Sequence, residues 1–209
     1  MKISVSYLGS DEIGKTLSLL DKTTVDFIHV DVMDGKYVKQ KTIGYGELKS
    51  IGYYTKKRLD VHFMVMKPLK YIDDYANLNV SYMTVHLDMQ DNLDKVIERI
   101  KLYGIKVGIA VNPSQDIELV YPYLSKIDLV LIMTVVPGLP GQKLIPEVIP
   151  KIDKLKKEIK KQKVDVLISC DGGINKDNKH DLKGSDILAV GSYITNSKDY
   201  EEAIQTLRD

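Results

Sequence analysis

Short runs of apolar residues recur along the chain, separated by longer segments in which apolar and charged residues alternate at helical spacing. Apolar runs of this length, bounded by polar or turn-forming residues, are typical of buried strands. They lie at residues 3–7, 25–32, 59–65, 82–86, 107–111, 129–134, 166–170 and 187–190. The pattern therefore predicts eight strands.

Amphipathic segments between these strands predict helices at residues 11–20, 46–53, 69–77, 93–103, 117–124, 146–161, 176–182 and 200–207. In the sixth helix, Ile152, Leu155 and Ile159 recur at spacings of three and four and predict one buried stripe. Asp91 and Asn92 can cap the fourth helix and Gly104 can end it. Strand–helix units repeated in this way predict parallel strands with helical crossovers.

The number of strand–helix units predicts the fold class. Eight such units in 209 residues favour a closed (β/α)8 barrel over an open doubly wound sheet, near the lower size limit of the barrel. No linker or low-complexity stretch interrupts the alternation, so we expect one α/β barrel domain over residues 1–209.

Composition excludes several classes of partner. Thirty basic residues balance 29 acidic ones, so the whole chain indicates neither nucleic-acid nor membrane binding. The lysine-rich face of segment 146–161 lacks interleaved aromatics and is interrupted by Glu158, which favours a solvated face. Cys170 has no partner cysteine in the sequence, and no apolar run is long enough for a signal peptide or a membrane span. We expect a cytoplasmic protein.

Candidate chemistry begins at His29 and Asp31. Residues two apart in a strand point to the same face, and this strand breaks at Asp34-Gly35. The pair suits two ligands of one metal, or a base and its partner. A buried histidine–carboxylate hydrogen bond would explain the pair equally well.

Active sites of such barrels lie at the carboxyl ends of the strands. Those ends carry Ser6, His29, Asp31, Met33, His62, Met64, His86, Asp88, Asn112, Met133, Thr134 and Asp171. Ionisable groups inside a barrel are costly unless they are paired or bound to metal. The set His29, Asp31, His62 and Asp171 suits a divalent first-row metal such as zinc, manganese or iron, and a hydrogen-bonded polar plug is the alternative.

Glycine-bearing segments follow the last three strands, at residues 137–142, 171–174 and 191–192. Loops after strands 7 and 8 of such barrels often bind phosphate through backbone N–H groups. With only three arginines in the chain, a backbone cradle is a better prediction than guanidinium forks. Ordinary turns would use the same glycines.

Six ordered blocks, at residues 29–35, 60–65, 107–113, 133–142, 171–175 and 190–192, together with Ser6, resemble the ribulose-phosphate 3-epimerase family. The resemblance runs almost from end to end. It implies a pentose-phosphate isomerase that interconverts D-ribulose 5-phosphate and D-xylulose 5-phosphate. It also implies a sugar-phosphate partner and assembly into a homo-oligomer, without nucleic acid or membrane.

By this resemblance, His29, Asp31, His62 and Asp171 hold one divalent metal ion, with zinc expected first and iron, manganese or cobalt as alternatives. Asp31 and Asp171 carry protons on opposite faces of the substrate's C3, through a cis-enediolate. Substrate contacts fall to Ser6, His62, Gly138, Leu139, Pro140, Gly141, Asp171, Gly172, Gly173, Gly191 and Ser192, and Met33, Met64 and Met133 line the pocket.

Departures from the family pattern surround the substrate and leave the four ligands intact. Pro140 stands where a glycine is usual, which removes one N–H donor and stiffens the lid over the phosphate. Val5 replaces a usual proline, and Asp88 replaces a usual glutamate.

Three functions other than epimerisation of D-ribulose 5-phosphate are alternatives. An epimerase of a related ketose phosphate, such as D-allulose 6-phosphate, would use the same residues. A non-catalytic metal-binding barrel is a further alternative. A decarboxylase of the orotidine-phosphate type would need a lysine two residues after Asp31, where this chain has Met33.

Overall fold

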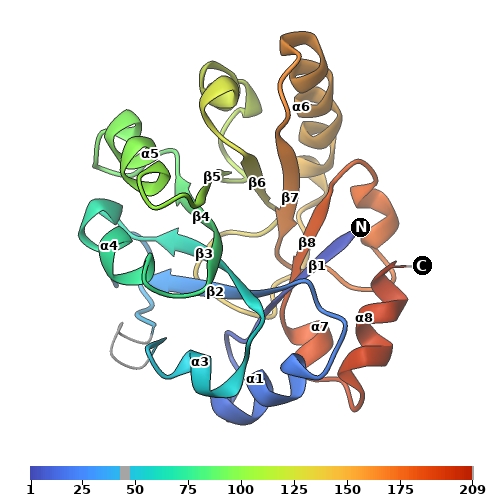
Figure 1. Ribbon diagram of the computed structural model, residues 1–209. Helices are drawn as coiled ribbons and strands as arrows, with labels where there is room; N and C mark the ends of the chain where they lie inside the picture. Colours follow the sequence, from blue (N-terminus) through green and yellow to red (C-terminus); the bar gives the residue numbers. More distant parts are fainter. Residues whose placement is uncertain (43–47, 209) are drawn as a thin grey trace.

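The computed structural model describes residues 1–42 and 48–208, in which eight parallel strands pair in chain order and close into a barrel (Figure 1). The strands are β1 Lys2–Ser6, β2 Phe27–Met33, β3 Arg58–Met64, β4 Val80–His86, β5 Lys106–Val111, β6 Leu129–Met133, β7 Leu167–Asp171 and β8 Ile187–Val190. Each strand overlaps its predicted range to within two residues at either end. The prediction of a (β/α)8 barrel is confirmed.

Helices surround the barrel in Figure 1. The longer ones are α1 Ile13–Asp21, α5 Leu93–Lys101, α6 Ile149–Gln162 and α8 Tyr200–Arg208. Shorter α-helices are α3 Ile51–Tyr54, α4 Ile72–Tyr75 and α7 Ser192–Thr195, and 3₁₀ segments are η1 Pro68–Lys70, η2 Ile117–Lys126, η3 Pro146–Val148 and η4 Lys179–Leu182. In the described ranges, no helix is both long and apolar enough to cross a membrane.

Several predicted helices differ in detail. Segment 117–124 is a 3₁₀ helix with Pro122 inside it, and the missing N–H of proline is poorly compatible with a regular α-helix. Segment 69–77 divides into η1 and α4, and segment 176–182 shortens to η4. Of segment 46–53, α3 contains the last three positions, whereas residues 43–47 lie outside the described part of the chain. Helix α7 was not predicted, because four residues show no period.

The caps of α5 are set by its own sequence. The side chain of Asn92 accepts a hydrogen bond from the backbone N of Lys95 at 3.1 Å, which satisfies one N–H at the start of the helix. Gly104 follows the last turn with a φ of +68°, a conformation that glycine adopts without strain. Asp91 does not cap this helix; its carboxylate accepts from the backbone N of Leu69 at 3.0 Å.

The barrel interior is divided into an apolar and a polar part. Alternate strand residues face inward, and apolar ones among them form one buried cluster of Phe27, Tyr82, Ala110, Leu129, Leu131, Met133 and Ile187. Phe27, Leu129 and Ile187 are the first residues of their strands, whereas Met133 is the last residue of β6. Buried polar side chains lie on β2, β3 and β4, with His29 and Asp60 near the middle of their strands and His62 and His86 nearer the carboxyl ends. These buried ionisable groups thus lie on three neighbouring strands.

Candidate active site

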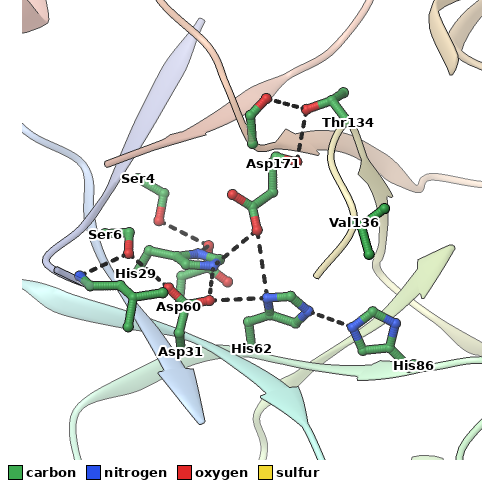
Figure 2. A network of polar contacts seen from close by, with 12 residues as sticks. Ser4, Ser6, His29, Asp31, Asp60, His62, His86, Thr134, Val136 and Asp171 are labelled. Carbon is green, nitrogen blue, oxygen red and sulfur yellow. Dashed lines mark hydrogen bonds and ion pairs between the residues drawn. The ribbon is translucent and has the colours of Figure 1, made fainter. Parts of the chain in front are cut away.

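Four predicted residues from three strands converge at the carboxyl end of the barrel (Figure 2). One ligand atom from each of His29, Asp31, His62 and Asp171 lies within 4.8 Å of the others. Strand alternation places His29 and Asp31 on one face of β2, and the register of β2 and β3 sets Asp31 directly beside His62. Asp171 is the last residue of β7 and reaches the same point from across the barrel.

The shortest approach in this group of four joins His62 Nδ1 to Asp31 Oδ1 at 3.2 Å. His29 Nε2 lies 3.4 Å from the same Asp31 oxygen. Asp171 Oδ2 lies 3.6 Å from His62 Nδ1 and 3.7 Å from His29 Nε2. Two imidazole nitrogens and two carboxylate oxygens therefore surround one point, and this donor set could hold a divalent metal ion.

The surroundings of His29 support that fit. Its Nδ1 lies 2.9 Å from Asp60 Oδ2, and the same oxygen accepts a hydrogen bond from Ser4 Oγ at 2.9 Å. Because a carboxylate only accepts, His29 carries a proton on Nδ1, and Nε2 is the nitrogen that faces the group. Nε2 is buried and has no hydrogen-bond partner among the described residues. An unpartnered imidazole nitrogen beside two carboxylates is a position that a cation would fill in place of a proton.

A second buried histidine stands behind His62. The Nε2 atoms of His62 and His86 lie 2.9 Å apart, and the ring of Tyr37 lies 4.6 Å from that of His86, between centroids. The hydroxyl of Tyr37 donates to Asp88 Oδ1 at 2.7 Å and accepts from Asn112 Nδ2 at 2.8 Å. His86, Asp88 and Asn112, expected at strand ends, thus form a chain leading outward from His62.

Asp31 is also held from the side opposite the histidines. Ser6 Oγ donates to Asp31 Oδ2 at 2.7 Å and itself accepts from the backbone N of Leu8 at 3.1 Å. This hydrogen bond occupies Oδ2 and leaves Oδ1 as the oxygen nearest the histidines. The last residue of β1 therefore fixes the orientation of the carboxylate.

The two aspartates differ in charge state. Burial disfavours the Asp31 carboxylate, but the neighbouring His29 and His62 outweigh it and hold its pKa below the usual value. Burial, reinforced by the charge of Asp31, raises the pKa of Asp171 to about 6. Two carboxyl groups whose pKa values are driven apart at one site are a common arrangement of base and acid.

The histidines differ as well. Burial opposes the imidazolium form of His29, but the carboxylates of Asp31 and Asp60 outweigh it and raise its pKa well above the usual value. Burial, with the charge of His62 adding to it, lowers the pKa of His86 well below the usual value. His86 is thus a neutral imidazole, whereas His29 is strongly basic until a cation replaces its proton.

The segment after β7 is fixed by the loop after β6. Thr134 reaches the carbonyls of Asp171 and Gly172 with its hydroxyl, and its backbone N donates to Asp171 O at 2.8 Å. Gly173 has a φ of +67°, and a Cβ there would overlap the backbone N of Leu144 and lie 2.7 Å from Gln142 O. Glycine is required here because two backbones approach closely.

A cavity of about 70 Å³ lies over the four residues, under the loop that follows β6. Its walls include Asp31, Asp171 and the predicted residues Ser6, Met33, Met64, Met133, Gly138, Leu139, Pro140, Gly141, Gly172, Gly173, Gly191 and Ser192. His29 and His62 are buried behind the wall of the cavity. An outer cavity of about 630 Å³ shares Gly141, Gln142, Gly173, Gly191 and Ser192 with it.

Pro140 lies at the tip of the loop that covers the inner cavity. A Cβ on Gly9 would lie 3.3 Å from Pro140 Cγ, so this loop packs closely on the loop after β1. The amide of Gln142 donates to the carbonyls of Val136 and Leu139 at 2.7 and 2.9 Å and holds the loop in a compact turn.

Comparison with known proteins addresses the identity of the site. The model of the ribulose-phosphate 3 epimerase family matches residues 2–195. The chain belongs to this family. A ribulose-phosphate 3-epimerase of Synechocystis sp. is 36% identical over 213 residues, covering 99% of this chain and 93% of that protein. One of Bacillus subtilis is 35% identical over 213 residues, covering 100% and 98%.

The expectation of an isomerase of the ribulose-phosphate 3-epimerase family is thereby confirmed. Among solved structures, 3-hexulose-6-phosphate synthase from Salmonella typhimurium superposes with a TM-score of 0.70 at 22% identity, covering 99% of this chain and 96% of that one. This likeness shows the shared barrel fold.

Asp60 and Tyr37 belong to the polar network but were given no role in the sequence interpretation. Asp60 precedes His62 by two positions, so the alternation that linked His29 with Asp31 also places Asp60 on the inner face of β3. The alternation of the strand was therefore a sufficient signal for including Asp60 in the site. Tyr37 lies in the loop after β2, and its contact with His86 depends on where this loop folds back. No sequence signal indicates it.

Proposed function

We propose that the chain is a metal-dependent epimerase that interconverts D-ribulose 5-phosphate and D-xylulose 5-phosphate by inverting C3. The observation that carries this proposal is the pair Asp31 and Asp171. Their carboxyl groups approach the same group of four from strands across the barrel, and their pKa values are displaced in opposite directions. Inversion of a carbon needs one base and one acid on opposite faces.

In this proposal Asp31 is the base for the proton on C3 of D-ribulose 5-phosphate. Its low pKa and the hydrogen bond from Ser6 keep it ionised at neutral pH. Asp171 returns a proton to the opposite face; burial and the charge of Asp31, which raise its pKa in the absence of the cation, favour its role as the acid. The reverse reaction exchanges the two roles through the same cis-enediolate.

The metal-binding residues are proposed to be His29, Asp31, His62 and Asp171, with zinc as the first expectation. Two imidazoles and two carboxylates suit zinc, and iron, manganese or cobalt would accept the same donors. When bound, the cation supplies positive charge that offsets the negative charge developing on the substrate oxygens. Met33, Met64 and Met133 line the cavity and exclude water from the reacting carbon.

The phosphate is proposed to lie where the two cavities meet. Gly141, Gly173, Gly191 and Ser192 line both of them, and the first residue of α7 is Ser192. Backbone N–H groups at such loops suit a phosphate dianion. The inner cavity alone is smaller than the roughly 300 Å³ usual for ligand sites, so the sugar phosphate must extend toward the outer cavity or displace the covering loop.

An epimerase assay on the pentulose phosphate, with and without chelator, tests the proposal. Asp171→Asn removes the returning acid, and we expect kcat/KM to fall by about 10²–10⁴-fold. Chelation should abolish turnover of the wild type, and added zinc should restore it. Asp153→Asn, on the exposed face of α6, is the matched control and should keep full activity.

Two outcomes would contradict the proposal. Full activity of Asp171→Asn would remove Asp171 from the proton transfer. A clear preference for D-allulose 6-phosphate over D-ribulose 5-phosphate would assign the same chemistry to a hexulose substrate.

A further inference from the structure

The two metal-binding histidines differ in what stands behind them. Asp60 lies 2.9 Å from His29 Nδ1, and a carboxylate can only accept the proton there. The proton on His29 Nδ1 is therefore fixed whether or not a cation is present. Behind His62 lies the imidazole of His86, with the two Nε2 atoms 2.9 Å apart (Figure 2).

A hydrogen bond between two imidazole nitrogens has two possible directions. One nitrogen must carry the proton and the other must offer its lone pair. His62 can therefore donate from Nε2 to His86, or accept at Nε2 from His86. Both rings are buried, so water does not compete for either nitrogen.

The direction is set by a cation in the group of four. His62 Nδ1 lies 3.2 Å from Asp31 Oδ1 and faces this group. A cation needs the lone pair of His62 Nδ1, so the proton of metal-bound His62 lies on Nε2 and His86 must accept.

The ring of His86 is held in place by its neighbours. The ring of Tyr37 lies 4.6 Å away, between centroids, at a tilt of 34°, and Asp88 and Asn112 fix the Tyr37 hydroxyl. The other ring nitrogen, His86 Nδ1, is buried and has no hydrogen-bond partner among residues 1–42 and 48–208. No second partner therefore fixes the tautomer of His86, in contrast to His29.

We propose that His86 is a positioning residue that holds metal-bound His62 in the tautomer with its proton on Nε2. This inference rests on the proposed metal site and deepens it. His86 does not touch the metal or the substrate. It acts by accepting a hydrogen bond from the N–H that His62 must carry at Nε2 in the loaded state.

Nitrogen-15 NMR of the full chain with labelled histidines measures the direction of this bond. In the zinc-loaded protein we expect His62 protonated on Nε2, His86 protonated on Nδ1, and scalar coupling between the two Nε2 atoms across the hydrogen bond. A zinc-loaded protein in which His86 carries its proton on Nε2 would overturn the inference.

Zinc affinity, measured by competition with a chromophoric chelator, tests the same inference by substitution. His86→Phe keeps a ring against Tyr37 but removes the acceptor, and we expect zinc affinity to fall by about 10–100-fold. His86→Gln offers an amide oxygen to His62 and should recover most of the loss. His180→Gln, at an exposed histidine in η4, is the matched control and should bind zinc like the wild type.

The outcomes separate this inference from the proposed function. If the wild type binds zinc and His86→Phe binds it equally well, only the role of His86 fails. If the wild type binds no zinc, the proposed metal site fails and the inference fails with it. Should His86→Phe not fold, as judged by circular dichroism, the NMR measurement on the wild type still decides.

Discussion

The two sides of the barrel mouth are built by different means. On the side of β2, β3 and β4, side chains are the functional groups, and His29, Asp31 and His62 are held by buried partners such as Asp60 and His86. On the side of β6, β7 and β8, glycine-bearing backbone lines both cavities. Asp171 is the one member of the group of four that comes from the second side.

This difference has a physical cause. Side chains on a strand are directed by its period of two, so ligands can be placed on one face by local sequence alone. A backbone cradle instead requires loops that approach closely, as Gly173 and Leu144 do. We therefore expect substitutions on the first side to impair metal binding and proton transfer, and substitutions on the second to affect substrate binding and stability.

Asp31→Asn should have the largest effect, because it removes both a proposed base and a proposed ligand. We expect kcat/KM to fall by at least about 10⁴-fold, measured in the epimerase assay with saturating zinc. Asp153→Asn serves again as the control. Activity within tenfold of the wild type would show that the side of β2, β3 and β4 does not provide the base.

Asp60→Asn should have an intermediate effect, because an amide can turn its N–H₂ toward His29 and no longer fixes Nδ1 as the protonated atom. We expect zinc affinity to fall by about 10–100-fold. Chelator competition measures it. If Asp60→Asn raised KM for the sugar phosphate and left zinc affinity unchanged, it would contradict the assignment of metal binding to the side of β2, β3 and β4.

Metal affinity should depend on pH, with a sign set by Asp171. Its pKa is raised to about 6, so below that pH a proton occupies the carboxylate and the cation must displace it. Zinc affinity should fall as the pH is lowered through 6, by about tenfold per pH unit for one displaced proton. The raised pKa of His29 extends the dependence to higher pH. An affinity that is flat from about pH 5 to about pH 8 would contradict these protonation states.

Gly173→Ala tests the side of β6, β7 and β8 and should have the smallest effect on metal binding and proton transfer. The new Cβ would overlap Leu144 N at a φ of +67°, so we expect the free energy of unfolding to fall by about 1–3 kcal/mol and KM to rise. Zinc affinity should stay at the wild-type value. Gly52→Ala, where a Cβ would meet no atom within 4 Å, is the control for adding a methyl group. Loss of zinc binding in Gly173→Ala would show that the two sides of the barrel mouth are coupled.

The fold was largely predictable because its signals are local. Each strand is a run of apolar residues that can be recognised from its own sequence. Asn92 caps the start of α5 with a side-chain hydrogen bond, and Gly104 follows its last turn with a positive φ. The exceptions are also local in origin. Pro122 converts one expected α-helix into a 3₁₀ segment, and α7 is too short to show a period.

Sequence alone placed His29, Asp31 and Met33 on one face of a strand, because side chains alternate whatever the strand packs against. It also supplied His62 and Asp171 as candidates at other strand ends. What it could not supply are the distances between strands far apart in the chain. Closure of the barrel brings Asp171 to within 3.7 Å of His29, and the packing of a loop puts Tyr37 against His86. Those contacts depend on tertiary structure, because no local rule relates residues that lie far apart in the chain.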